Sequence, residues 1–125
     1  MPKLTERKKI LVVDDDRAIT AMLEGVLSTQ GYTVFIAYDG LDGMVQVSKN
    51  LPDLIILDVM MPEINGYDVC SNLKFDEKYK HIPIIVLTSR ERELDERIGQ
   101  LMGIDYMQKP IDRKVLLEKI HNALK

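Results

Sequence analysis

The chain has 125 residues, a net charge of −3 and a hydrophobic content of 46%, which suits one globular domain with one core. Its 17 basic and 20 acidic residues argue against nucleic-acid binding by this domain, since such binding rests on clustered basic charge. No apolar run approaches the roughly 20 residues of a membrane-spanning helix, so no membrane partner is expected. The single cysteine, Cys70, cannot form an internal disulfide, and we expect a packing residue in a cytoplasmic protein.

The first half of the chain alternates strand-like and helix-like segments. Residues 10–13 and 33–37 are apolar and β-branched, which predicts strands. Between them a helix is predicted, with Asp16 as its N-cap and Gly31 as its terminating glycine. Its apolar positions are Ile19, Met22, Leu23, Val26 and Leu27. A second helix is predicted from helical spacing of Leu41, Met44 and Val47, with Gly43 in its interior and Pro52 after its end.

The second half repeats this alternation. Strands are predicted over residues 54–57, 84–87 and, more weakly, 104–107. Helices are predicted from the apolar residues Val69, Cys70 and Leu73, from Leu94, Ile98 and Leu101 before Gly103, and from Val115, Leu116, Ile120, Ala123 and Leu124 after the cap Asp112. Five strand-helix repeats predict an α/β fold, with a parallel sheet covered by helices on both faces.

Polar residues follow four of the predicted strands. They are Asp14 and Asp15, Asp58, Thr88, and Lys109. In a parallel sheet the carboxyl ends of the strands meet at one edge, where functional groups collect, so these side chains are expected to converge.

A cluster of carboxylates needs a compensating cation. Lys109 supplies part of the charge, and oxygen ligands with no histidine or cysteine nearby favour Mg²⁺ or Mn²⁺ over zinc. A carboxylate can attack phosphorus to form an aspartyl phosphate, and the metal and Lys109 would offset the charge on the phosphoryl oxygens. The Thr88 hydroxyl could donate a hydrogen bond to one of those oxygens.

The sequence segments at these strand ends resemble the response-regulator receiver signature of two-component systems. The matching segments are ILVVDDD at residues 10–16, LDVMMP at residues 57–62, Gly66, VLTS at residues 86–89, and Lys109-Pro110. The resemblance implies a single receiver domain over residues 1–125, with a basic lead-in over residues 1–8 and no output domain in this chain. It implies a flavodoxin-like, doubly wound five-stranded sheet of strand order 2-1-3-4-5, with five helices.

The resemblance also implies a role for each site residue. Asp58 is the expected phosphoacceptor, assisted by Lys109 and Thr88. Asp15, Asp58 and the backbone carbonyl of Met60 would hold the metal, with Asp14 in the same acid pocket, directly or through a water molecule. Thr88 and Tyr106 are the expected switch residues, and the Lys109-Pro110 bond is expected to be cis. The run from Gly103 to Lys109 is one residue shorter than the family's usual spacing, although Tyr106 keeps its place three residues before Lys109.

Partners follow from the same resemblance. The phosphoryl donor would be a sensor histidine kinase or a histidine phosphotransfer protein. Phosphorylation would shift an existing equilibrium toward an active state, read out on the face of helix four, strand five and helix five by a downstream protein or a fused output domain. The same face could carry an activation-dependent dimer. Such a domain is no enzyme in the usual sense, because it catalyses only its own phosphorylation and dephosphorylation.

Three alternatives share parts of this pattern. A haloacid-dehalogenase-type phosphohydrolase would use Asp14 as nucleophile, but a later acid pair for its metal is missing. A flavodoxin-like cofactor binder would have small residues or glycine after the first strand, where this chain has Asp-Asp-Asp-Arg. A receiver-like interaction module without phosphorylation would lack some of Asp15, Asp58, Thr88 and Lys109, and all four are present.

Overall fold

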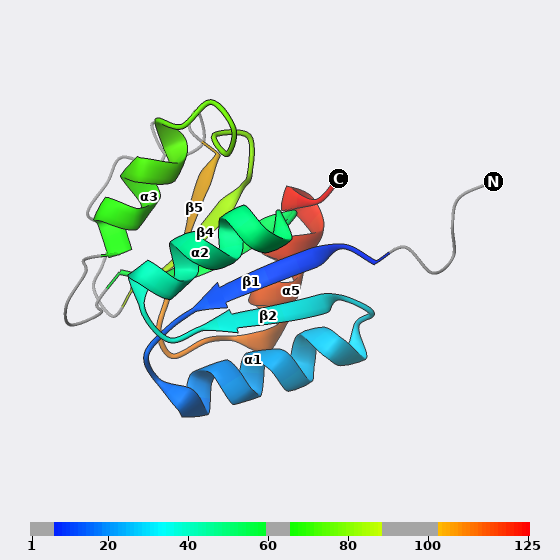
Figure 1. Ribbon diagram of the computed structural model, residues 1–125. Coiled ribbons are helices and arrows are strands. Elements are labelled where there is room, and N and C mark those ends of the chain that lie inside the picture. Colours follow the sequence, from blue (N-terminus) through cyan, green and yellow to red (C-terminus); the bar gives the residue numbers. More distant parts are fainter. Residues whose placement is uncertain (1–6, 60–65, 89–102) are drawn as a thin grey trace.

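The computed structural model describes residues 7–59, 66–88 and 103–125 of the chain (Figure 1). The strands are β1 (Lys9–Val13), β2 (Thr33–Ala37), β3 (Leu54–Asp58), β4 (Ile84–Thr88) and β5 (Ile104–Gln108). The helices are α1 (Arg17–Thr29), α2 (Gly40–Asn50), α3 (Gly66–Lys74) and α5 (Arg113–Ala123). The helix expected around Ile98 falls on residues 89–102, outside the described residues, so the count of five helices stays a prediction.

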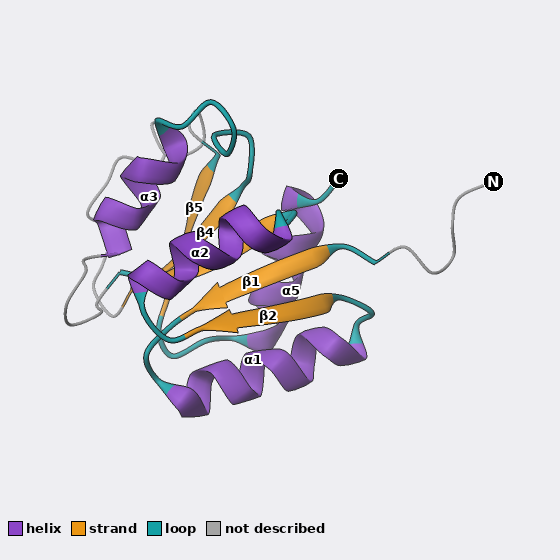
Figure 2. Cartoon of the chain, viewed as in Figure 1, coloured by secondary structure: helices purple, strands orange, loops and turns teal. Residues whose placement is uncertain are grey.

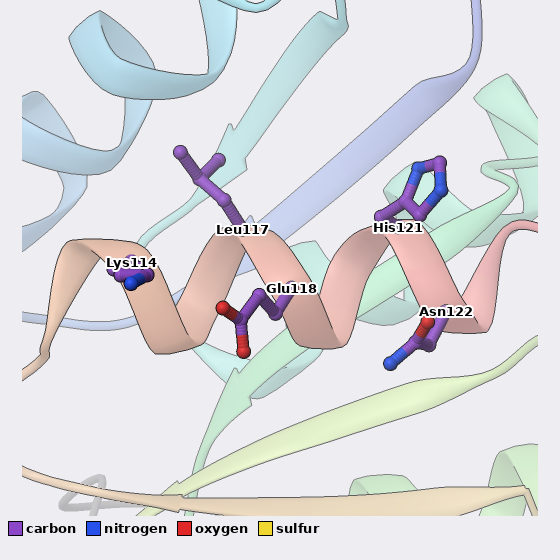
Figure 3. A pocket seen from close by; sticks show the side chains of 5 residues that line it. All are labelled: Lys114, Leu117, Glu118, His121 and Asn122. Carbon is purple, nitrogen blue, oxygen red and sulfur yellow. The ribbon is translucent and has the colours of Figure 1, made fainter.

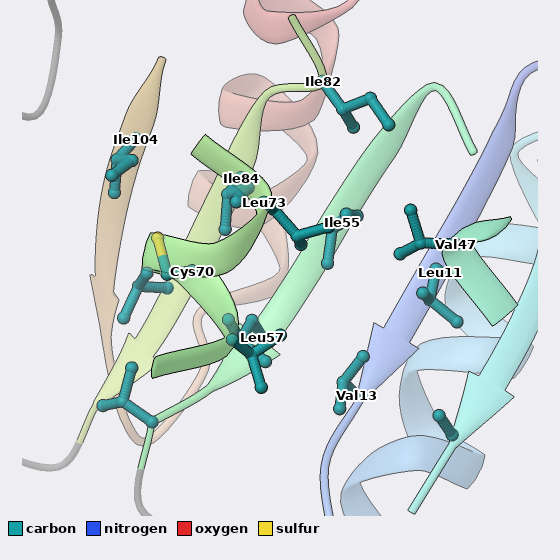
Figure 4. Close-up of a cluster of buried hydrophobic side chains, with 14 residues drawn as sticks. Leu11, Val13, Val47, Ile55, Leu57, Cys70, Leu73, Ile82, Ile84 and Ile104 are labelled. Carbon is teal, nitrogen blue, oxygen red and sulfur yellow. The ribbon is translucent and has the colours of Figure 1, made fainter. Parts of the chain in front are cut away.

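The five strands form one parallel sheet of order β2-β1-β3-β4-β5, as predicted. Helices α2 and α3 cover one face of this sheet, and α1 and α5 cover the other (Figure 2). Two apolar layers fill the space between sheet and helices. Because side chains alternate along a strand, Leu11 and Val13 of β1 enter the first layer, while Ile10 and Val12 enter the second. Figure 4 shows the first layer, where side chains of β1, β3 and β4 meet those of α2 and α3.

The predicted helix ends of α1 are confirmed. The Asp16 side chain accepts hydrogen bonds from the backbone N–H groups of Ala18 at 2.9 Å and Ile19 at 3.2 Å. Gly31 has a φ of 90°, in the left-handed region that favours glycine after a helix. Asp112 caps α5 in the same way, through the N–H of Val115.

Gly43 allows α2 to approach the sheet closely. A Cβ atom at this position would lie 3.2 Å from both γ carbons of Val13, tighter than ordinary contact. Glycine has a low helix propensity, but at position 43 any larger residue would crowd the Val13 side chain.

Some apolar residues of the predicted helices point outward, which corrects the apolar faces inferred from spacing. Met22 is 41% exposed, Leu41 67% and Val115 40%. Each lies at the margin of its helix's apolar stripe, where spacing alone does not separate buried from exposed positions.

Lys74, the last residue of α3, is buried at the amino end of the sheet. Its ammonium group donates hydrogen bonds to the backbone carbonyls of Lys80, at 3.1 Å, and Ile82, at 2.6 Å. Its Nζ also lies 3.1 Å from where a Cβ would stand on Gly103, which has a φ of 73° directly before β5. Burial lowers the pKa of Lys74. Lys74 thus fastens the segment between α3 and β4 by bonds to neutral acceptors.

The predicted packing role of Cys70 is confirmed. Cys70 is buried in the first apolar layer, and burial raises the pKa of its thiol to about 11, as suits a packing residue. His81 and His121 are exposed. Among the helices of the described residues, none has the length and apolar character needed to cross a bilayer.

Candidate functional site

The acidic residues that end β1 and β3 meet at the carboxyl edge of the sheet. Val13 pairs with Leu57 in the parallel ladder, so Asp14 and Asp58 follow at neighbouring positions. One carboxylate oxygen from each of Asp14, Asp15 and Asp58 lies within 4.8 Å of the others. Asp14 and Asp58 are buried, whereas Asp15 is exposed. The expected convergence of the strand ends is therefore present.

Lys109 brings a cation to the two buried carboxylates. Its backbone N–H donates to the Thr88 carbonyl at 2.8 Å, which extends the pairing of β4 and β5 beyond their last residues. Its Nζ lies 3.4 Å from Oδ2 of Asp14 and 3.4 Å from Oδ2 of Asp58. The Lys109-Pro110 bond is cis, as predicted. One ammonium group thus faces two acids, at distances longer than a strong charged hydrogen bond.

Asp14 is held in an environment that disfavours its charge. The pKa of Asp14 is raised from 3.8 to about 6. Burial is the largest cause and the charge of Asp58 adds to it, whereas the backbone hydrogen bond from Asp16 and the neighbouring Lys109 lower the pKa. The Asp16 N–H donates to Asp14 Oδ1 at 2.9 Å. Burial is thus the main reason that the Asp14 carboxyl resists ionisation, and Lys109 offsets this burial and the charge of Asp58 only in part.

The cluster has the properties of a site for a hard divalent cation. Its donors are carboxylate oxygens, which suit Mg²⁺ or Mn²⁺. Three carboxylates cluster around one lysine that pairs with two of them, and a further cation would offset both the burial and the repulsion by Asp58 that raise the pKa of Asp14. Asp14, Asp15 and Asp58 fit such an ion, while Met60, expected to add its carbonyl, lies outside the described residues.

Thr88 lies on β4, the strand next to that of Asp58, and Tyr106 lies on β5, the strand beyond it. Thr88 is the last residue of β4, one position beyond Leu87, which pairs with Asp58. It is 3% exposed. Tyr106 pairs with Val86, two residues before Thr88, so Thr88 and Tyr106 belong to the same face of the sheet. The ring of Tyr106 packs against the apolar layer under α2 and α3, and its hydroxyl oxygen is buried.

Sequence reasoning assigned no role to Arg17 and Tyr38, which lie beside this site. The guanidinium carbon of Arg17 stands 4.0 Å from the centroid of the Tyr38 ring. The two residues are 21 positions apart (38 minus 17), so their contact depends on the pairing of β1 with β2. The one local signal was a basic residue at the first position of a helix, where acidic residues are preferred.

The comparisons with known proteins agree with this architecture. The family model of the response regulator receiver domain matches residues 10–121. A Chloroflexus aurantiacus protein assigned as a response regulator is 36% identical, with a TM-score of 0.85 over 95% of this chain and 98% of that chain. Chemotaxis protein CheY4 of Vibrio cholerae is 30% identical, with a TM-score of 0.85 over 95% of this chain and 100% of that chain.

A third similar structure is the signal receiver domain of a signal transduction histidine kinase from Syntrophus aciditrophicus. It is 32% identical, with a TM-score of 0.82 over 94% of this chain and 89% of that chain. The phosphohydrolase alternative that made Asp14 the nucleophile gains no support from these matches. With the family model covering residues 10–121, the chain belongs to the response regulator receiver domains, the signalling modules of two-component systems.

Proposed function

We propose that Asp58 is the residue that accepts the phosphoryl group. The observation that carries this proposal is the position of its carboxylate, 3.4 Å from Lys109 Nζ and clustered with the carboxylates of Asp14 and Asp15. The donor is a phosphohistidine of a sensor histidine kinase or of a histidine phosphotransfer protein. One carboxylate oxygen of Asp58 attacks phosphorus, the P–N bond breaks, and its electron pair returns to the histidine nitrogen.

The surrounding residues serve this transfer by charge and position. Lys109 offsets negative charge on the phosphoryl oxygens while it holds its place between two acids. Asp15, Asp58 and the Met60 carbonyl would hold Mg²⁺ or Mn²⁺, with Asp14 directly or through a water molecule. A bound divalent ion supplies further charge compensation to the phosphoryl group. The domain acts only on itself, as acceptor and then as the site of hydrolysis.

The switch couples this site to an output surface. The Thr88 hydroxyl donates to a phosphoryl oxygen, and the Tyr106 ring changes its burial in response. The output surface spans about residues 94–124, that is β5, α5 and the predicted helix before them, which falls outside the described residues. In the described part of this surface, a shallow hollow runs along the exposed side of α5 (Figure 3). It is lined by Lys114, Leu117, Glu118, His121 and Asn122. A downstream protein, a fused output domain or an activation-dependent dimer would read this surface.

Phosphorylation and adduct formation test the assignment directly. The protein is incubated with acetyl phosphate and Mg²⁺, or with beryllofluoride and Mg²⁺, and examined by intact mass and by NMR. Wild type gains the adduct, and Asp58→Asn does not. Asp68→Asn, which removes an exposed carboxylate in the first turn of α3, serves as the control and keeps the adduct.

Two results would contradict this function. An adduct that persists in Asp58→Asn would place the acceptor elsewhere. Turnover of para-nitrophenyl phosphate that is lost in Asp14→Ala but kept in Asp58→Ala would point to the phosphohydrolase. The single-domain organisation of residues 1–125 and the cytoplasmic location stay predictions.

A further inference from the structure

Arg17 follows the acids Asp14 and Asp15 closely in the chain, yet it pairs with no carboxylate of the acid pocket. It is the first residue of α1 and directly follows three acids, Asp14, Asp15 and Asp16. Within residues 7–59, 66–88 and 103–125, its recorded contact is the Tyr38 ring, with the guanidinium carbon 4.0 Å from the ring centroid. The guanidinium group of Arg17 therefore lies on the Tyr38 ring and not on one of the nearby carboxylates.

The helix itself gives no reason for an arginine at this position. A helix N-terminus carries positive partial charge, so a basic residue there is unfavourable, and after the N-cap Asp16 the first turn of α1 holds no acidic residue. Arg17 is also within reach of the acid pocket. Its Cα is two residues from that of Asp15, at most about 7.6 Å away. A guanidinium group binds carboxylates through two parallel hydrogen bonds, so Arg17 can compete for the same oxygens as a metal ion.

Tyr38 is well placed to bind the Arg17 guanidinium group. It follows the last residue of β2, Ala37, whose carbonyl accepts a hydrogen bond of 3.1 Å from the Asp14 N–H. On its other side, the Asp39 side chain caps α2 through the N–H of Asp42 at 2.7 Å. The backbone on both sides of Tyr38 is thus fastened, one side directly to the acid pocket. The face of a tyrosine ring attracts a guanidinium group.

We propose that Tyr38 is a positioning residue that keeps the Arg17 guanidinium out of the acid pocket, which leaves the oxygens of Asp14, Asp15 and Asp58 to a divalent cation. This inference rests on the proposed function, since it concerns the metal site of that function. Tyr38 would then influence the metal affinity of the site without contacting either the metal or the phosphoryl group. In the absence of the ring, Arg17 turns toward the carboxylates and metal binding weakens.

The test is the Mg²⁺ affinity of the unphosphorylated protein, measured by calorimetry and by NMR titration. Tyr38→Leu keeps apolar bulk but removes the aromatic face. We expect its Kd for Mg²⁺ to rise about two- to fivefold, the range that corresponds to the loss of one exposed cation–π contact. Tyr38→Phe keeps the ring and is the matched control, with an affinity close to that of wild type.

The double variant separates this competition from a general disturbance of the loop. In Arg17→Gln there is no guanidinium to release, so adding Tyr38→Leu to that background leaves the Mg²⁺ affinity unchanged. A readout without metal is the ring-current shift of the Arg17 side-chain protons, which is present in wild type and Tyr38→Phe and lost in Tyr38→Leu. Thermal unfolding of each variant without Mg²⁺ verifies that the fold is kept.

The outcomes separate this inference from the proposed function. If wild type binds Mg²⁺ and Tyr38→Leu binds it equally well, or loses the same affinity with and without Arg17, the positioning role is wrong and the metal site stands. If wild type gives no Mg²⁺-dependent change at Asp15 and Asp58, the metal site fails, and the positioning role fails with it.

Discussion

Lys109 and Lys74 are two lysines held at opposite ends of the same sheet, and they differ in what their ammonium groups face. Lys109, at the carboxyl end, lies 3.4 Å from each of two carboxylates, Asp14 and Asp58. Lys74, at the amino end, donates to two backbone carbonyls and is the more buried, with 8% of its surface exposed. Burial of a cation therefore does not by itself mark a functional site. A cation facing surplus negative charge can compensate an incoming anion, whereas one satisfied by neutral carbonyls fastens the chain.

Removal of the Lys109 ammonium group should have the largest effect, and the effect should be on chemistry. We expect Lys109→Met to slow phosphorylation by acetyl phosphate about 100-fold or more, the usual cost of losing a preorganised charge partner in a transition state. The rate is followed by intact mass at saturating Mg²⁺. Lys74→Met is the matched control and keeps a rate near that of wild type. Equal rates in wild type and Lys109→Met would refute the assignment of Lys109 to the phosphoryl group.

The Asp14 carboxyl should make the metal-free protein less stable as the pH rises. Its pKa in the folded state is about 6, against 3.8 for an unperturbed group, so folding favours the protonated form. The associated stability is fully present below about pH 4, and is lost as the pH rises to about 6, to a total of about 3 kcal/mol. The difference in unfolding free energy between Asp14→Asn and wild type, from urea titrations, should grow by this amount between about pH 4 and pH 7.

Mg²⁺ sharpens the same prediction. A bound divalent cation favours the ionised carboxylates, so the pH-dependent difference between wild type and Asp14→Asn should shrink at saturating Mg²⁺. Parallel urea titrations in EDTA and in MgCl₂ measure this. A difference that is independent of both pH and Mg²⁺ would contradict the electrostatic description of the pocket.

Lys74 should matter for stability and not for phosphorylation. In Lys74→Met the carbonyls of Lys80 and Ile82 lose their buried donor, which should cost about 1–3 kcal/mol of unfolding free energy. The matched control is Lys80→Met, which removes an exposed ammonium group and leaves the Lys80 carbonyl in place. Urea unfolding at neutral pH compares the two variants. A cost in Lys80→Met equal to that in Lys74→Met would show that the two carbonyl bonds contribute little.

The sequence predicted the carboxyl end of the sheet better than the amino end, for a physical reason. Residues such as Asp58 stand directly after β-branched runs, and a parallel sheet necessarily collects strand ends at one edge. The caps Asp16 and Asp112 were predictable because each acts on N–H groups within three residues. These features depend on local sequence and on topology alone.

Features that depend on contacts between distant residues were not predictable from one sequence. The burial of Lys74 follows from where the segment before β4 passes, and the tolerance of Gly43 follows from the Val13 side chain. The stacking of Arg17 on Tyr38 requires β1 and β2 to be paired first. The outward direction of Val115 depends on the exact rotation of α5 against the sheet. In each case tertiary packing decides what the residue does.

Lys119 extends the comparison to a half-buried lysine whose partner is an exposed carboxylate, and its removal should have the smallest effect. Its Nζ lies 3.1 Å from both carboxylate oxygens of Asp105, but the two side chains are 28% and 54% exposed. Water reaches the exposed Asp105 carboxylate and part of the Lys119 side chain, so Lys119→Gln should cost less than about 1 kcal/mol of unfolding free energy and less still at high salt. Urea titrations at low and high NaCl measure both effects. Asp105→Asn is the informative partner variant, because Asp105 Oδ1 also accepts the Tyr106 N–H at 2.8 Å. If Lys119→Gln cost as much unfolding free energy as Lys74→Met, then neither the exposure of a lysine nor the chemistry of its partner would predict how much that lysine stabilises the fold.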